Sequence, residues 1–175
     1  MVDPEVFAAM EPWLKNQFGN AASRNHIFGW AAEEAVEIAR ELTAEIIGAY
    51  PNEIIFTSGA TEANNLAIQG AALNASSNKK HIITLKTEHK AVLDICDYLE
   101  KNGFSITRLP VNKEGMIDLT LIEKSIKKET LLVSVMHVNN EIGVIQPIKE
   151  VVEIAKKYKC LVHCDAAQAL CKINI

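Results

Sequence analysis

Four short polar stretches, each at the end of an apolar run, contain the residues of this sequence that could do chemistry. The first is "FTSGATEANNLA" at residues 56–67, where small residues follow the apolar run and a hydroxyl, Thr61, opens the predicted helix. Small residues such as Ala60 let backbone N–H groups approach a phosphate, and the helix N-terminus adds positive potential. Thr61 is also suited to cap that helix with its hydroxyl, so a capped turn without ligand remains an alternative.

The second and third stretches place an imidazole and two amides after apolar runs. His89 lies in "TEHKA", where it is suited to transfer protons, to stack on a planar ligand or to cap the following helix. Asn139, Asn140 and Glu141 lie in "HVNNEIGVIQP", where they suit either ligand contacts or the hydrogen bonds of a tight turn. Neither stretch decides between the two interpretations by itself.

The fourth stretch, "HCDAAQA", contains a carboxylate at the edge of a buried run. Asp165 follows largely apolar residues, and Gln168 lies three positions later. A carboxylate in such a position needs a cationic or hydrogen-bonding partner. For an isolated aspartate, an arginine of the protein is the first expectation.

The four cysteines match no familiar metal or disulfide pattern. Cys96, Cys160, Cys164 and Cys171 have neither zinc-knuckle nor disulfide-framework spacing. Alternation along a strand puts Cys160 and Cys164 on one face and His163 on the other, so these three do not converge on a metal ion. We expect all four thiols to be reduced and structural, because free cysteines are commonly buried.

Alternating strand-like and helix-like segments must position these residues. We expect strands at 53–58, 81–87, 105–111, 130–138 and 160–166, and helices at 30–49, 61–75, 90–103, 118–128 and 148–159. This alternation indicates an α/β fold, with a mostly parallel sheet and helices on both faces. In such sheets the ligand lies beyond the carboxyl ends of the strands, where all four polar stretches fall.

Length and composition limit the classes of function. The chain has 175 residues, 49% hydrophobic and 23% charged, which suits one globular domain with a core. Its net charge of −4 argues against general binding to nucleic acid or membrane surfaces. No apolar run reaches the ~18 residues of a membrane span, and the first residues show no secretory pattern, so a cytoplasmic, reducing setting is expected.

Together, the four stretches describe one kind of ligand. A phosphate cradle, an imidazole, two amides and a buried carboxylate at one sheet edge suit a phosphorylated heteroaromatic cation. Pyridoxal 5′-phosphate is such a ligand, because its phosphate fits the turn and its ring nitrogen pairs with the carboxylate. That pairing keeps the ring protonated and makes it an electron sink.

Five stretches also carry a resemblance that covers nearly the whole chain. They read "ASRNHIFGWAAEEAVEIAR", "EIIFTSGATEANNLAI", "HIITLKTEHKAVLD", "LLVSVMHVNNEIGVIQPI" and "VHCDAAQALCKI". In this order they are similar to the iron–sulfur-cluster branch of the cysteine desulfurases, in the class V aminotransferase family. The resemblance implies that residues 1–175 are an incomplete large domain of a fold-type I pyridoxal phosphate-dependent enzyme.

The resemblance also implies a role for each site residue. The pair Ala60–Thr61 matches the phosphate-binding turn, and His89 matches the imidazole that stacks on the pyridine ring and assists proton transfer. Asn140 matches the amide near the cofactor's phenolic oxygen and the substrate carboxylate. Asp165 matches the carboxylate on the pyridine nitrogen, and Gln168 matches the hydrogen-bond partner of the phenolic oxygen.

The implied activity is that of a cysteine desulfurase. Sulfur is removed from L-cysteine, alanine is released, and a persulfide forms on an enzyme cysteine. The sulfur then passes to an iron–sulfur scaffold protein or to tRNA-thiolation proteins. Members of the family dimerise through the large domain.

The sequence departs from the family pattern at several points. Ala21 stands in "FGNAAS" where proline is usual, and Met1 directly precedes "VDP", where the family has a strand and a turn first. The family's cofactor-binding lysine in a Ser-x-His-Lys segment, its persulfide cysteine and its small domain match nothing in these 175 residues, and neither Lys90 nor Lys172 matches that lysine. We therefore expect this chain alone to be inactive, poorly stable and able to bind pyridoxal phosphate weakly, without a covalent bond.

Two functions from other classes are alternatives. The chain could be a non-catalytic interaction protein that dimerises with a full-length desulfurase. A nucleotide-binding domain is disfavoured, because neither G-x-G-x-x-G nor G-x-x-x-x-G-K-[ST] occurs in the sequence.

Overall fold

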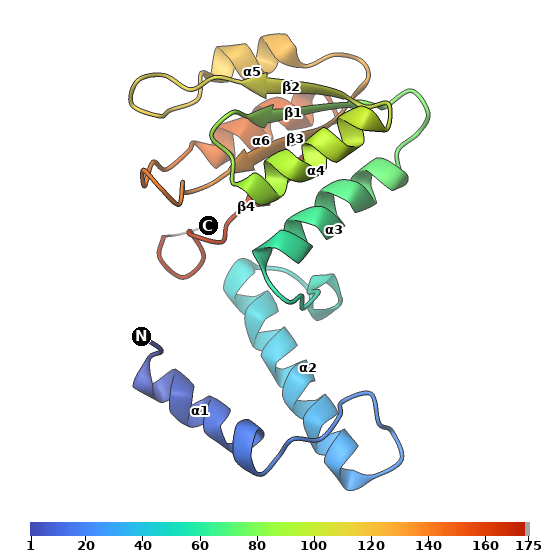
Figure 1. The fold of residues 1–175 in the computed structure, drawn as a ribbon, viewed down its shortest axis with the longest axis vertical. Helices are drawn as coiled ribbons and strands as arrows, with labels where there is room; N and C mark the ends of the chain where they lie inside the picture. The colour runs from blue at the N-terminus through green and yellow to red at the C-terminus, as the bar shows by residue number, and fades with distance from the viewer. Residues whose placement is uncertain (174–175) are drawn as a thin grey trace. The chain divides into compact units, whose positions relative to one another are not determined.

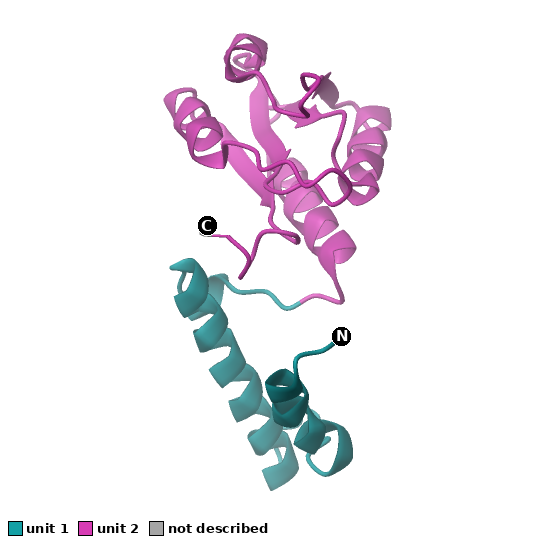
Figure 2. Ribbon diagram, turned by 90° about the vertical axis from the view of Figure 1, so that its left-hand side faces the viewer, with its two compact units in different colours: residues 1–56 teal, residues 57–175 magenta. Residues whose placement is uncertain are grey.

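The computed structural model describes residues 1–173 and divides into two compact units (Figure 2). Residues 1–56 form the first unit, and the second begins at Thr57. The boundary falls inside the stretch 53–58, which the sequence predicts as the first strand.

The first unit consists of two helices and a short 3₁₀ helix. These are α1 (Pro4–Lys15), α2 (Ile27–Ile47) and η1 (Pro51–Glu53). Asp3 caps α1, because its carboxylate accepts a hydrogen bond from the Glu5 N–H at 2.8 Å. Helix α2 ends at Gly48, whose φ of 66° gives the left-handed C-cap that glycine favours. The hydrophobic pattern predicts α2 but misses α1, although an Asp-Pro pair is a helix-start signal.

The second unit is built on a four-stranded parallel sheet with the strand order β2-β1-β3-β4 (Figure 1). The strands are β1 (His81–Leu85), β2 (Ser105–Leu109), β3 (Thr130–Met136) and β4 (Leu161–Asp165). The helices are α3 (Ala60–Leu73), α4 (Lys90–Lys101), α5 (Leu119–Ser125) and α6 (Ile148–Lys157). The predicted α/β class with a parallel sheet is confirmed.

Apolar side chains on both faces of the sheet hold these helices. One cluster joins Ile82 of β1 to Ile68 of α3 and Val92 of α4. The other joins Ile83 of the same strand to residues of α5 and to Val151 of α6. Consecutive residues of a strand point to opposite faces, and helices cover both faces here, which explains why all five residues of β1 are buried. Figure 1 accordingly shows α4 in front of the sheet and α6 behind it.

The predicted strand at 53–58 is wrong, and within residues 1–173 the sheet has four strands instead of five. Ile54 has an extended backbone, with φ −89° and ψ 127°, but residues 54–57 pair with no strand in the described part of the chain. The side chains of Ile55 and Phe56 are exposed. β-branched residues favour strand geometry, yet a strand forms only where a neighbour completes its hydrogen bonds.

The other predicted elements agree with the structure in type and order, and their ends differ by a few residues, as is usual for such boundaries. Within residues 1–173, no helix is both long enough and apolar enough to cross a lipid bilayer.

Candidate functional site

A cavity of about 170 Å³ lies at the carboxyl ends of β3 and β4. Its lining consists of Ala60, His89, Met136, Val138, Asn140, Asp165, Ala167 and Gln168. Five of the six predicted site residues are among them, and Thr61 is the exception. The carboxyl ends of parallel strands meet at one edge of the sheet, which is why residues from distant parts of the chain gather here.

Helix α3 starts at this cavity with Ala60, directly after Gly59. The predicted cap by Thr61 is wrong, because Gly59 occupies the N-cap position and no side chain caps the helix. Glu62 instead reaches back, and its Oε2 accepts hydrogen bonds from the Ser58 N–H at 2.6 Å and the Ser58 hydroxyl at 2.7 Å. These two bonds lower the pKa of Glu62. The N–H groups of the first turn have no acceptor within the helix, so they are suited to an anion.

His89 combines two of the roles that its position suggests. It is the N-cap of α4, where its Nδ1 accepts a hydrogen bond from the Ala91 N–H at 3.1 Å. It also lines the cavity. Because Nδ1 accepts, the proton of the neutral ring lies on Nε2.

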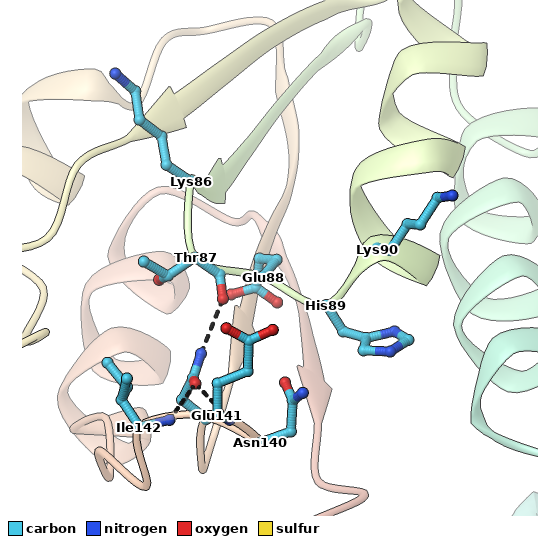
Figure 3. A pocket seen from close by; sticks show the side chains of 9 residues that line it. Lys86, Thr87, Glu88, His89, Lys90, Asn140, Glu141 and Ile142 are labelled. Atoms are coloured by element: carbon cyan, nitrogen blue, oxygen red, sulfur yellow. Dashed lines mark hydrogen bonds between the residues drawn. The ribbon is translucent and has the colours of Figure 1, made fainter.

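Asn139 and Asn140 divide the two roles predicted for this stretch. The Nδ2 of Asn139 donates to the Thr87 carbonyl at 2.9 Å, and its Oδ1 accepts from the N–H groups of Glu141 and Ile142 at 2.9 and 3.0 Å (Figure 3). Asn139 therefore ties the loop after β3 to the loop after β1. Asn140 lines the cavity, so its amide is the one placed for ligand contacts.

Asp165, the last residue of β4, is 6% exposed. Its Oδ2 accepts a hydrogen bond from Asn64 Nδ2 at 2.8 Å, and its Oδ1 accepts one from the Ala167 N–H at 3.0 Å. The expectation of an arginine partner is wrong, because both groups that donate to the Asp165 carboxylate are uncharged. Gln168 follows in the same segment, and its Oε1 accepts from Lys172 Nζ at 3.0 Å.

Glu88 is a buried acid that the sequence does not single out. Its Oε1 accepts from the Met136 N–H at 2.9 Å, and its Oε2 has no hydrogen-bond partner among the described residues. Burial raises the pKa of Glu88 to about 8; the bond from Met136 opposes this, and the charge of Asp165 adds to it. Glu88 lines a second cavity of about 450 Å³, whose wall also includes His89 and Asn140 (Figure 3).

All four cysteines are free, and the burial expected for them holds for Cys96 and Cys160, whereas Cys164 is half-buried. Burial raises the pKa of both Cys96 and Cys164 to about 11, and it also raises the pKa of Cys160. Thiols with such pKa values stay protonated near neutral pH and are poor nucleophiles. Cys171 is exposed. Residues 1–173 contain no group of three or more His, Cys, Asp or Glu side chains arranged to hold a metal ion.

A parallel α/β unit with a cavity at the carboxyl edge of its sheet, lined by an imidazole, two amides and a carboxylate among apolar side chains, defines a class of ligand-binding proteins. Within that class, the chain belongs to the aminotransferase class-V family, which matches residues 1–175.

Proteins similar to this chain include the cysteine desulfurase of Rattus norvegicus, which is 56% identical over 174 residues, covering 99% of this chain and 39% of that protein. The cysteine desulfurase IscS of Rickettsia prowazekii is 54% identical over 174 residues, covering 99% of this chain and 42% of that protein. A solved NifS-like protein superimposes with a TM-score of 0.94 at 40% identity, covering 99% of this chain and 48% of its own. The chain thus spans about two fifths of the length of these curated relatives, and the family expected from the sequence is confirmed.

Proposed function

We propose that these residues bind pyridoxal 5′-phosphate and that the whole protein acts as a cysteine desulfurase. The observation that carries the proposal is the cavity at the carboxyl edge of the sheet, which gathers an imidazole, two amides, a buried carboxylate and a helix N-terminus from separate segments. The cysteine desulfurases among the relatives support the reaction.

The donor set of this cavity fits a phosphorylated pyridine. The Asp165 carboxylate takes two uncharged hydrogen bonds and forms no salt bridge among the described residues, so a protonated ring nitrogen would be its charged partner. The first turn of α3, at Ala60, offers N–H groups to a phosphate. Asn140 and Gln168 offer amides to the oxygen atoms of the ligand. When bound, the protonated ring supplies an electron sink.

His89 is the residue placed to hold or move a proton. Its Nδ1 is fixed by the Ala91 N–H, so Nε2 is the atom at which a proton is exchanged. The neighbouring Glu88 is largely protonated near neutral pH because burial raises its pKa to about 8. Glu88 therefore adds no full negative charge beside Asp165.

The proposed reaction removes sulfur from L-cysteine, releases alanine and passes the sulfur to an acceptor, such as an iron–sulfur scaffold or a tRNA-thiolation protein. The chain spans about two fifths of the length of its curated relatives. We therefore propose this activity for the whole protein and cofactor binding for residues 1–175. These residues would then be part of a large, cofactor-binding domain.

A second candidate function is binding to another subunit through residues 1–56. Helix α1 buries none of its residues, and Phe7, Trp13, Trp30 and Leu42 are exposed. Exposed apolar side chains at this density are typical of an interaction surface. Native mass spectrometry of a mixture with a full-length desulfurase should show a mixed dimer, and separate, unmixed species would contradict this candidate.

Isothermal titration calorimetry of the chain with pyridoxal 5′-phosphate tests the main proposal. We expect weak, reversible binding that Asp165→Ala weakens about tenfold or more, because a hydrogen bond to a charged group contributes ~1.5–3 kcal/mol. His89→Ala should weaken binding less, because its ring meets no full charge. Asn65→Ala is the control, because the Asn65 amide donates to the Thr61 carbonyl within the same helix and does not line the cavity. Binding that survives Asp165→Ala unchanged refutes the proposed site, and a wild-type chain that binds nothing refutes the proposed function.

A further inference from the structure

A continuous row of hydrogen bonds leads from the interior of the sheet to the carboxylate of the cavity. Ser134 Oγ lies 2.9 Å from His163 Nδ1, and His163 Nε2 lies 3.0 Å from Asn64 Oδ1. Asn64 Nδ2 then donates to Asp165 Oδ2 at 2.8 Å. Ser134 and Asn64 are buried, with 0% and 4% of their surfaces exposed. We call the three residues Ser134, His163 and Asn64 the Asp165 relay.

The geometry of the sheet explains why these side chains meet. Ser134 in β3 is the registered neighbour of His163 in β4. His163 and Asp165 are two residues apart on β4, so their side chains point to the same face of the sheet. Asn64 lies on α3, which packs on that face. A single amide therefore reaches both the imidazole and the carboxylate.

The direction of each hydrogen bond follows from the carboxylate. An ionised carboxylate accepts and cannot donate, so Asn64 must turn its NH₂ group toward Asp165 and its carbonyl toward His163. That carbonyl is an acceptor, so His163 Nε2 must carry a proton. Burial lowers the pKa of His163, although the charge of Asp165 opposes this shift. Because the lowered pKa keeps the ring neutral, Nδ1 is left to accept from the Ser134 hydroxyl. Every bond in the relay therefore donates toward Asp165.

We infer that Asn64 and His163 are positioning residues that fix the Asp165 carboxylate for the ring nitrogen of a pyridine ligand. The inference rests on the proposed binding of pyridoxal 5′-phosphate. Asn64 holds one carboxylate oxygen and the Ala167 N–H holds the other, so the carboxylate plane is set before a ligand arrives. Because the relay is neutral, it orients the carboxylate without cancelling the charge that a cationic ring nitrogen needs.

The tautomer of His163 tests the relay without any ligand. The chain has five histidines, and ¹⁵N labelling of all of them with assignment of His163 through His163→Gln isolates the ring of interest. In the cofactor-free chain at neutral pH, we expect His163 to carry its proton on Nε2 and to have a bare Nδ1. Asn64→Leu, which removes the acceptor, should make the ring exchange between tautomers, whereas Asn65→Leu should leave its spectrum unchanged. A proton on Nδ1, or a doubly protonated ring, in the wild-type chain overturns the relay.

The affinity for pyridoxal 5′-phosphate, measured by calorimetry, tests the role toward the ligand. Asn64→Leu should weaken binding about five- to tenfold, because Asp165 loses a fixed donor. His163→Leu should weaken binding less but measurably. His163→Gln should restore the wild-type affinity, because a glutamine NH₂ is able to donate to Asn64 Oδ1. Asn65→Leu is the matched control on the same helix.

The two measurements separate failure of the inference from failure of the proposed function. If the wild-type chain binds pyridoxal 5′-phosphate but Asn64→Leu and His163→Leu bind it equally well, the positioning role is wrong and the proposed function stands. If the wild-type chain binds none, the proposed function is wrong and the positioning role falls with it, while the ¹⁵N spectrum still decides whether the hydrogen bonds run as derived. Should Asn64→Leu not fold, the comparison of His163→Leu with His163→Gln makes the same decision.

Discussion

The unit that begins at Thr57 should lose stability as the pH rises. Replacing Glu88 with glutamine should abolish most of that loss. Burial raises the pKa of Glu88 from its ordinary value of 4.5 to about 8. At pH values between 4.5 and 8, the folded protein therefore keeps a proton on Glu88 that the unfolded chain has already released. The stability that this group contributes is fully present below pH 4.5 and is lost as the pH rises through 8. Glutamine is neutral throughout, so the variant should show no such loss.

The expected size of this effect follows from the pKa. The difference between 8 and 4.5 is about 3.5, and each pKa unit corresponds to ~1.4 kcal/mol, so ionising Glu88 costs up to ~5 kcal/mol of the free energy of unfolding. A domain of this size has a total stability of ~5–15 kcal/mol, so the loss should be easily measured. In Glu88→Gln the amide oxygen continues to accept from the Met136 N–H, which preserves the packing.

Urea unfolding followed by far-ultraviolet circular dichroism, from about pH 4.5 to about pH 9, measures the effect. Tryptophan fluorescence is unsuitable, because Trp13 and Trp30 both lie in residues 1–56 and do not report on the sheet. Glu114→Gln is the control, since Glu114 is exposed. If wild type and Glu88→Gln lose the same free energy of unfolding over this range, the buried acid is not responsible and the reasoning is refuted.

Two further predictions concern single side chains. Burial lowers the pKa of His81, whose ring bonds Thr130 and Thr107, so stability should be present above its ordinary pKa of 6.5 and fall as the pH drops below it. Urea midpoints should fall less steeply with acid in His81→Leu, and an unchanged slope would count against this. Asn139→Ala should cost ~1–3 kcal/mol and abolish hydrogen-exchange protection of the Ile142 amide, because the bonds that tie the loop are lost. Asn140→Ala should leave that amide protected, and equal effects of the two changes would contradict the division of roles.

The site is largely predictable from the sequence because parallel strands all end at one edge. His89, Asn140 and Asp165 each follow an apolar run, and the fold brings them to one cavity. The same logic fails at 53–58, because local residues set the preference for an extended backbone but a distant neighbour decides whether a strand forms. Thr61 lies two positions after the observed N-cap, because α3 begins at Ala60 and Gly59 is the N-cap residue.

The relay behind Asp165 is beyond the reach of sequence patterns. Asn64 is 101 positions from Asp165 along the chain, and the contact depends on how α3 packs across the sheet. Asn64 lies less than one helical turn after Thr61, in a segment that the sequence predicts as a helix. Nothing in the pattern distinguishes it from any other residue of that helix. Glu88 is similar, because its position in "TEHKA" resembles an exposed polar turn and its burial arises from β3, whose Met136 N–H it meets.

The central claim is that pyridoxal 5′-phosphate binds at the carboxyl edge of the sheet. A ¹H–¹⁵N NMR titration of the chain with this compound tests it most directly. The account predicts that the largest amide shifts occur at Ala60, His89, Asn140 and Gln168, and that Asp165→Ala suppresses them together. Shifts concentrated in residues 1–56 would contradict it, and so would shifts concentrated on α5 and α6, which cover the face of the sheet opposite to α3 and α4.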